Sequence, residues 1–228
     1  MFLTVSNEIK WRKMGWGAVI TLAVVLCGIF LFDKPLYILI RKLNCGLWNL
    51  FDMLFGAKVW LVSSLVAFVV LCVKKYMKSE FCFRDKANNM SLRRTVREIY
   101  SKTKTSNAAL IFFSVLTAAV SVKVLKTLIG RARPIFFEAL DMTGFYPPSL
   151  DWAFNSMPSG HTAISFAGLV MIGMLAPKFK VFTWTLAILI GVSRVAVGAH
   201  WPSDVILGAF IGMVIADIIK SQLLKKTA

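Results

Sequence analysis

Six apolar runs, separated by polar segments, dominate the hydrophobic pattern of this 228-residue chain. They cover approximately residues 15–32, 57–73, 107–125, 160–176, 181–199 and 204–219. Each run approaches the roughly 20 apolar residues that a helix needs to cross about 30 Å of hydrocarbon. The pattern therefore predicts an all-α, polytopic membrane helix bundle with six transmembrane helices. We expect the first run to be retained, because Phe32-Asp33 offers no small-residue cleavage pattern.

Two of the connecting segments differ from ordinary short loops in length and composition. Residues 34–56 place Arg41 and Asp52 among leucines and aromatic residues, a mixture typical of a helix that lies in the membrane interface. Residues 74–104 are polar and basic, and they predict a short surface helix near residues 91–100. We therefore expect one interfacial helix and one basic loop between the membrane helices.

The composition agrees with a membrane protein, since 57% of the residues are hydrophobic. A net charge of +16 could indicate a nucleic-acid partner, but 18 of the 27 Lys and Arg residues flank the same ends of the predicted helices. The positive-inside rule assigns that side to the cytoplasm, together with both termini. We therefore expect no nucleic acid partner, and we place residues 33–56, 126–159 and 200–203 outside.

Cysteine and histidine usage argues against cross-links and metal ions. The four cysteines fall in different predicted compartments, no CxxC spacing occurs, and the chain has two histidines. The sequence predicts no disulfide, no metal site and no cofactor. Gly208 and Gly212, four residues apart in the last run, favour close contact with another membrane helix.

The first segment that carries candidate chemistry follows the third run. Lys126 and Arg133 are seven residues apart, close to two helical turns, and Pro134 disfavours helical geometry at Arg133. We expect the helix to end nearby and Arg133 to fold back, so that both cations can bind a phosphate. The alternative is that both side chains only reach for the interface. Arg131 is expected at the rim of this site or in solvent.

The second segment, Pro158-Ser159-Gly160-His161, directly precedes the fourth run. Ser159 is a favourable N-cap, and the first turn of a helix leaves backbone N–H groups free to hold an anion. Gly160 would let a phosphate approach the backbone, and His161 could then donate a proton to a leaving oxygen. The alternative is that His161 only satisfies backbone groups at the cap.

The third segment joins the last two runs and contains Arg194, His200 and Asp204. Pro202 favours the first helical position, which makes Trp201 the cap and Asp204 the third helical residue. An acid there can reach back across the cap. It could accept a hydrogen bond from His200 Nδ1 and leave Nε2 as a free nucleophile. The alternative is a charged cap, which would account for Asp204 alone.

The three segments converge, because both histidines and three separated cations map to the outer side. They resemble the signature of the type 2 phosphatidic acid phosphatase (PAP2) family, KxxxxxxRP, PSGH and SRxxxxxHxxxD. Every fixed position matches: Lys126, Arg133, Pro134, Pro158, Ser159, Gly160, His161, Ser193, Arg194, His200 and Asp204. The resemblance covers roughly residues 107–219. It divides the chain into residues 1–105, with two membrane helices, the interfacial helix and the basic loop, and a catalytic membrane core at 106–228.

The resemblance implies a metal-independent lipid phosphatase. His200 would form a phosphohistidine, Asp204 would orient it, and His161 would act as acid and base. Lys126, Arg133, Ser159, Gly160 and Arg194 would bind the phosphate. The substrate stays open among undecaprenyl pyrophosphate, lipid A, phosphatidylglycerol phosphate and phosphatidic acid, and the expected location is a bacterial inner membrane with a periplasmic site. A lipid phosphotransferase and a non-catalytic phospholipid-binding or transport protein are the alternatives.

Overall fold

The computed structural model describes residues 1–84 and 103–224, with side chains omitted from the description at 78–84. Its described helices are α1 (Trp11–Cys27), α2 (Asp33–Arg41), α3 (Gly46–Leu54), α4 (Ala57–Arg84), α6 (Asn107–Ile129), α7 (Pro134–Leu140), α8 (Gly160–Leu175), α9 (Lys180–Ala196) and α10 (Pro202–Leu224). A π-helical turn at Gly28–Phe32 joins α1 to α2. In the described parts of the chain, extended pairing is limited to isolated bridges, so the predicted all-α class is confirmed.

Among the residues that the structure describes, five helical stretches are long and apolar enough to cross a membrane: Trp11–Arg41, Gly46–Met77, Asn107–Ile129, Pro177–Ala196 and Pro202–Leu224. The remaining predicted run corresponds to α8, an apolar helix of 16 residues. Its length of about 24 Å, at 1.5 Å per residue, is less than the thickness of the hydrocarbon core. The fold is thus that of an integral membrane helix bundle. The prediction that six helices cross the membrane stays a prediction.

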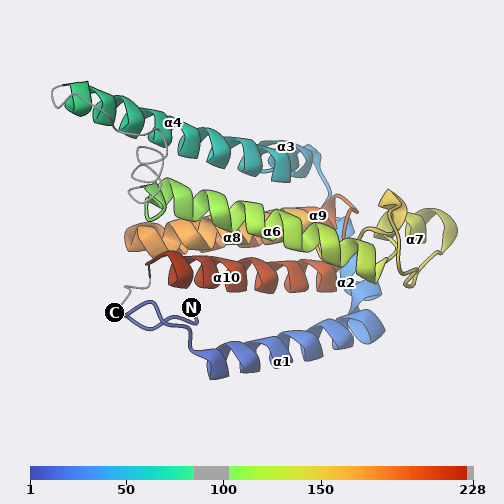
Figure 1. The fold of residues 1–228 in the computed structure, drawn as a ribbon. Coiled ribbons are helices and arrows are strands. Elements are labelled where there is room, and N and C mark those ends of the chain that lie inside the picture. The colour runs from blue at the N-terminus through green and yellow to red at the C-terminus, as the bar shows by residue number, and fades with distance from the viewer. Residues whose placement is uncertain (85–102, 225–228) are drawn as a thin grey trace.

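The short helix α8 forms the centre of the bundle, and α6, α9 and α10 pack around it (Figure 1). Leu169 and Met171 of α8 are buried against Leu110 of α6 and Ile190 of α9. By contrast, α1 and α4 flank the bundle and leave most of their apolar side chains exposed. Such exposed apolar surface suits contact with lipid. Met1 and the C-terminal end of α10 lie at one end of the bundle, and α7 lies at the other (Figure 1).

Two glycines let α10 approach α8 closely, as their spacing predicted. A Cβ atom at Gly208 would lie 2.6 Å from the carbonyl oxygen of Ser159. A Cβ atom at Gly212 would lie 2.4 Å from the carbonyl oxygen of Ala163. Both distances are too short for any side chain, and the backbones therefore pack directly against each other. This crossing fixes the start of α10 beside the start of α8.

The prediction of a single interfacial helix over residues 34–56 is wrong. The segment contains two helices, α2 and α3, separated at residues 42–45, where Cys45 has an extended backbone. Asn44 and Gly46 have low helix propensity, which explains a break at this position. Figure 1 shows α2 turned across the end of the bundle and α3 leading into α4. The surface helix expected near residues 91–100 lies outside the described residues, and the predicted division of the chain at residue 105 stays a prediction.

The glycine crossing can be tested with Gly212→Leu. Because the new side chain would meet the Ala163 carbonyl, we expect the folded state to lose about 1–3 kcal/mol or more. The measurement is thermal unfolding of the detergent-purified protein. Gly15→Leu is the matched control, since Gly15 is also inside a helix but has open space around it. Equal melting temperatures for Gly212→Leu and the unmodified protein would contradict the crossing.

Candidate active site

The chain leaves α6 through Gly130, which ends the helix in the left-handed conformation with φ of +60°. A Cβ atom there would lie 2.4 Å from the Tyr146 carbonyl oxygen, so the position requires glycine. Arg133 then has an extended backbone, with φ of −78° and ψ of 152°, and Pro134 begins α7. The predicted end of the helix before Arg133 is therefore confirmed. The local geometry turns Arg133 back toward Lys126.

Lys126 and Arg133 converge on the loop before α8. The Lys126 ammonium group donates to the carbonyl oxygens of Asn155 and Ser156. Arg133 Nη2 donates to the same Asn155 carbonyl at 3.3 Å, and Arg133 Nε donates to the Trp152 carbonyl at 2.9 Å. The Arg133 guanidinium also lies 4.3 Å from the centre of the Trp152 ring. Both cations are thus held by neutral backbone acceptors, which leaves their charge available to an anion.

The start of α8 lies against this pair. A Cβ atom at Gly160 would be in ordinary van der Waals contact with Lys126, at 3.6 Å from its Cε, so the lysine side chain lies beside the first residue of α8. Ser159 occupies the N-cap position, but its side chain does not cap the helix, and that part of the prediction is wrong. Its hydroxyl oxygen instead accepts a hydrogen bond from Thr162 Oγ1 at 2.9 Å. The N–H groups of the first turn still have no carbonyl partner within the helix.

The start of α10 follows the capping pattern that the sequence predicted. Pro202 is the first helical residue, and Asp204 Oδ2 accepts a hydrogen bond from the Trp201 N–H at 2.9 Å. The Asp204 carbonyl oxygen accepts a hydrogen bond from the Ser159 N–H at 2.9 Å. This backbone contact ties α10 to α8 at the level of the candidate site.

His200 lies beside Asp204, with 3.8 Å between His200 Nδ1 and Asp204 Oδ2. The predicted direct hydrogen bond is therefore not formed, and Nδ1 has no hydrogen-bond partner among the described residues. The reason is that Oδ2 already accepts hydrogen bonds from Ser156 Oγ and from the Trp201 N–H. The separation is still that of an ion pair, so the carboxylate would stabilise a positive charge on the imidazole.

The electrostatic environment keeps His200 neutral. Its side chain is only 2% exposed, and this burial lowers the pKa of His200 well below its usual value. The positive charge of Lys126 lowers the pKa further, and Asp204 opposes the shift. Arg133 and Arg194 add smaller shifts in the same direction as Lys126. Burial also lowers the pKa of Arg133 to about 10, so this guanidinium keeps its charge near neutral pH.

Arg131 is buried at 5% exposure, which corrects the expectation of a rim or solvent position. Its Nη1 donates to Asp204 Oδ1 at 2.6 Å, and its Nη2 donates to Asp33 Oδ2 at 2.7 Å. Asp33 begins α2 and also accepts a hydrogen bond from the Ser203 N–H at 2.9 Å. A buried ion-pair network thus connects α2 to the carboxylate beside His200. The sequence signal for Asp33 was an acidic residue at the end of an apolar run, which often marks a functional position.

Arg194 comes from the last turn of α9 and is buried. Its Nη1 donates to Asp52 Oδ1, and the same oxygen lies 3.8 Å from His161 Nε2. Within the described part of the chain, Arg194 Nε has no hydrogen-bond partner. Asp52 lies on α3, so this helix covers the side of the site where His161 and Arg194 meet. The sequence pattern predicts for Asp52 only a place in an interfacial helix. An acidic residue in an apolar segment often marks a functional position, and this signal could have identified Asp52.

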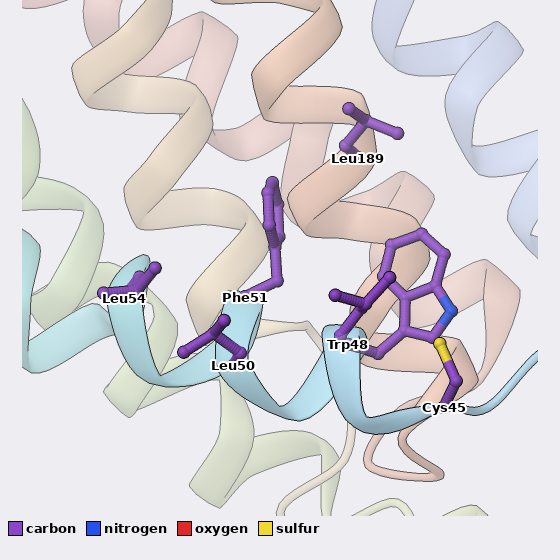
Figure 2. A pocket seen from close by; sticks show the side chains of 7 residues that line it. Cys45, Trp48, Leu50, Phe51, Leu54 and Leu189 are labelled. Carbon is purple, nitrogen blue, oxygen red and sulfur yellow. The ribbon is translucent and has the colours of Figure 1, made fainter.

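An apolar groove of about 380 Å³ lies between α3 and α9. It is lined by Cys45, Leu47, Trp48, Leu50, Phe51, Leu54 and Leu189. Figure 2 shows Phe51 and Trp48 of α3 pointing toward α9, which carries Leu189. Phe51 directly precedes Asp52, and Leu189 lies five residues before Arg194. The groove therefore lies on the same two helices that carry Asp52 and Arg194.

The site offers nitrogen donors and positive charge. Within residues 1–84 and 103–224, no group of three or more His, Cys, Asp or Glu side chains is placed to hold a metal ion. The groups that could neutralise an anion are instead Lys126, Arg133 and Arg194, with the first turn of α8. Such an arrangement fits a tetrahedral oxyanion beside a neutral imidazole.

The chain is similar in sequence and fold to known proteins. The family model described as PAP2 superfamily matches residues 107–228. A lipid A 1-phosphatase of Rhizobium johnstonii is 32% identical over 218 residues, which cover 91% of this chain and 83% of the relative. An undecaprenyl-diphosphatase of Sulfolobus acidocaldarius is 34% identical over 119 residues, covering 50% of this chain and 53% of the relative. The crystal structure of Aquifex aeolicus LpxE is 24% identical, covers 84% of this chain and 96% of that chain, and superposes with a TM-score of 0.52, which shows a shared fold.

The family model covers more than half of the chain, and the Rhizobium relative is similar over most of both sequences. The match includes all three segments that form the site described above. The chain belongs to the PAP2 superfamily of membrane phosphatases.

Proposed function

We propose that this protein removes phosphate from a lipid-linked substrate through a phosphohistidine intermediate on His200. The observation that carries the proposal is a buried imidazole whose Nδ1 lies 3.8 Å from a carboxylate oxygen. Its Nδ1 faces Asp204, which leaves Nε2 as the nucleophile. A protein that only binds anions, without catalysis, would not require this imidazole–carboxylate pair.

In the first step, His200 Nε2 forms a bond to phosphorus while the bond from phosphorus to the leaving oxygen breaks. His161 donates its proton to that oxygen, and Asp204 stabilises the charged imidazole of His200. In the second step, His161 takes a proton from water, the water oxygen bonds to phosphorus, and the phosphorus–nitrogen bond breaks. The 3.8 Å separation between His200 and Asp204 would shorten as charge develops, as catalytic hydrogen bonds commonly do.

The cations supply what phosphoryl transfer needs most, which is positioning and neutralisation of the equatorial oxygens. Lys126 and Arg133 approach from α6 and the segment after it, and Arg194 approaches from α9. The first turn of α8, from Gly160, adds backbone N–H groups. These groups would do the work that a metal ion does in other phosphatases.

A lipid substrate is favoured by the apolar groove between α3 and α9. Ligand pockets of this size, with apolar walls and few polar groups, bury hydrocarbon well. We propose a lipid A-type 1-phosphate as the first candidate, because the relative that matches over most of this chain is a lipid A 1-phosphatase. We infer a periplasmic site in an inner membrane from charge. The starts of α1 and α9, which carry Arg12, Lys13 and Lys180, lie at the end of the bundle opposite α7 (Figure 1), and the positive-inside rule favours the cytoplasm for that end.

The proposal is tested by phosphate release from a panel of lipid phosphates in the presence of EDTA. We expect the purified protein to remain active with the chelator, and His200→Ala to lower kcat by roughly 10⁴-fold or more because the nucleophile is lost. Mass spectrometry of rapidly quenched protein should locate phosphate on His200. Full turnover by His200→Ala, or phosphate on another residue, would contradict the mechanism.

The Arg131 network should position Asp204 and His200 for the reaction. Arg131→Met leaves Asp33 and Asp204 buried without their cation, so we expect kcat to fall by about 10²-fold with little change in KM. The pH dependence of kcat should shift as well, since Arg131 no longer balances the Asp204 charge. Arg131→Lys should restore part of the rate. An unchanged pH profile in both variants would mean that the network only supports the fold.

Filling the groove should weaken binding of long hydrocarbon chains only. We expect Leu189→Trp to raise KM several-fold for a long-chain lipid phosphate and to leave hydrolysis of a short, soluble phosphate ester unchanged, because Leu189 lines the groove. Val181→Trp, at an exposed position of α9, is the matched control. A parallel loss for both substrates would show that the variant disturbs the phosphate site instead.

A further inference from the structure

Asp52 is an acidic residue in the place where an anion-binding site needs positive charge. It is the one charged residue of α3, whose sequence is GLWNLFDML. It also lies outside residues 107–228, which the family model matches. Its Oδ1 accepts a hydrogen bond from Arg194 Nη1 and lies 3.8 Å from His161 Nε2. One carboxylate oxygen therefore contacts both a proposed phosphate ligand and the proposed acid.

Carboxylate and phosphate oxygens are interchangeable partners for a guanidinium group. The planar fork of an arginine binds either anion with charge-assisted hydrogen bonds. The other two cations proposed to bind phosphate, Lys126 and Arg133, donate to backbone carbonyl oxygens instead. A phosphate that reached Arg194 and His161 would meet Asp52 at short range, and like charges at that distance repel.

We propose that Asp52 is an internal competitor of phosphate: it binds Arg194 in the empty site and is displaced when a phosphate group enters. The inference rests on the proposed function, because it assumes that Arg194 and His161 receive the phosphate. Its consequence is weak binding of free inorganic phosphate. The carboxylate returns to Arg194 as the product leaves, whereas a lipid substrate gains additional binding from its hydrocarbon chains.

The attachment of α3 is consistent with this displacement. None of the residues of α3 is buried, and Leu47, Leu50, Met53 and Leu54 are all exposed, so the helix is only partly covered by the rest of the bundle. The break before Gly46 separates α3 from α2. Helices with few buried contacts open locally at low cost in free energy. A small outward shift of α3 would withdraw Asp52 and leave α8, α9 and α10 in place.

The test is Asp52→Asn, which keeps the size of the side chain and removes its charge. We expect inorganic phosphate to inhibit hydrolysis of the lipid phosphate at an about tenfold lower concentration in this variant, because phosphate no longer competes with a carboxylate. Direct calorimetric titration with inorganic phosphate should show the same tenfold increase in affinity. Asp52→Glu retains the charge and should bind phosphate as weakly as the unmodified protein. Asp141→Asn, at an exposed position after α7, controls for the loss of one negative charge.

Phosphate affinity in Asp52→Asn that is unchanged or weaker than in the unmodified protein would overturn the inference. If the asparagine variant does not fold, Asp52→Ser is measured in the same way, and the same affinities decide. The titration needs no turnover, which separates the two proposals. If Asp52→Asn binds phosphate more tightly but the unmodified protein hydrolyses no lipid phosphate, the proposed function is refuted and the role of Asp52 is supported.

Discussion

The Asp204 carboxylate is the interaction on which the arrangement of the site depends. Oδ1 binds Arg131 after α6, and Oδ2 binds Ser156 before α8 and the backbone of Trp201 before α10. One side chain thus holds three segments that are far apart in the sequence. A buried carboxylate left without these partners would destabilise the fold by several kcal/mol, so the partners have to be in place together. His200 is positioned because its neighbour in the chain is fixed in this way.

The site also has to keep several cations close together in an apolar environment. Charges of equal sign repel more strongly as water is removed, and each buried charge loses its hydration. The structure offsets this in two ways. Arg131 and Arg194 contact carboxylates, whereas Lys126 and Arg133 donate to backbone carbonyl groups. The second pair keeps a larger share of its positive field, and that field acts on His200 and would act on a bound phosphate.

The sequence predicted the features that depend on neighbouring residues. The end of α6 before Arg133 followed from Pro134, and the start of α10 followed from Pro202 and Asp204. Six apolar runs likewise located the main helices. Local stereochemistry determines such features, and it can be worked out from a few adjacent residues. The spacing of the motif residues also predicted a candidate site, and the catalytic and binding roles of its residues stay predictions.

Features that depend on packing could not be predicted in the same way. An arginine such as Arg131 is usually exposed, and its burial here follows only from the positions of Asp33 and Asp204 in space. The missing hydrogen bond between His200 and Asp204 follows from competition by Ser156 and Trp201. The single interfacial helix was a plausible interpretation of composition, but composition does not locate a break such as the one at residues 42–45.

The N-terminal helices contribute charge to the site as well as hydrophobic surface. Of the described side chains that touch the site, residues 107–228 supply four cations, Lys126, Arg131, Arg133 and Arg194, and one carboxylate, Asp204. Two further carboxylates, Asp33 and Asp52, come from α2 and α3. Asp33 binds the arginine that holds Asp204, whereas Asp52 binds an arginine that faces the proposed phosphate position. Because the two acids differ in burial and in partner, the proposals give α2 and α3 different roles: α2 would stabilise the arrangement of Asp204 and His200, and α3 would adjust how strongly the site attracts an anion.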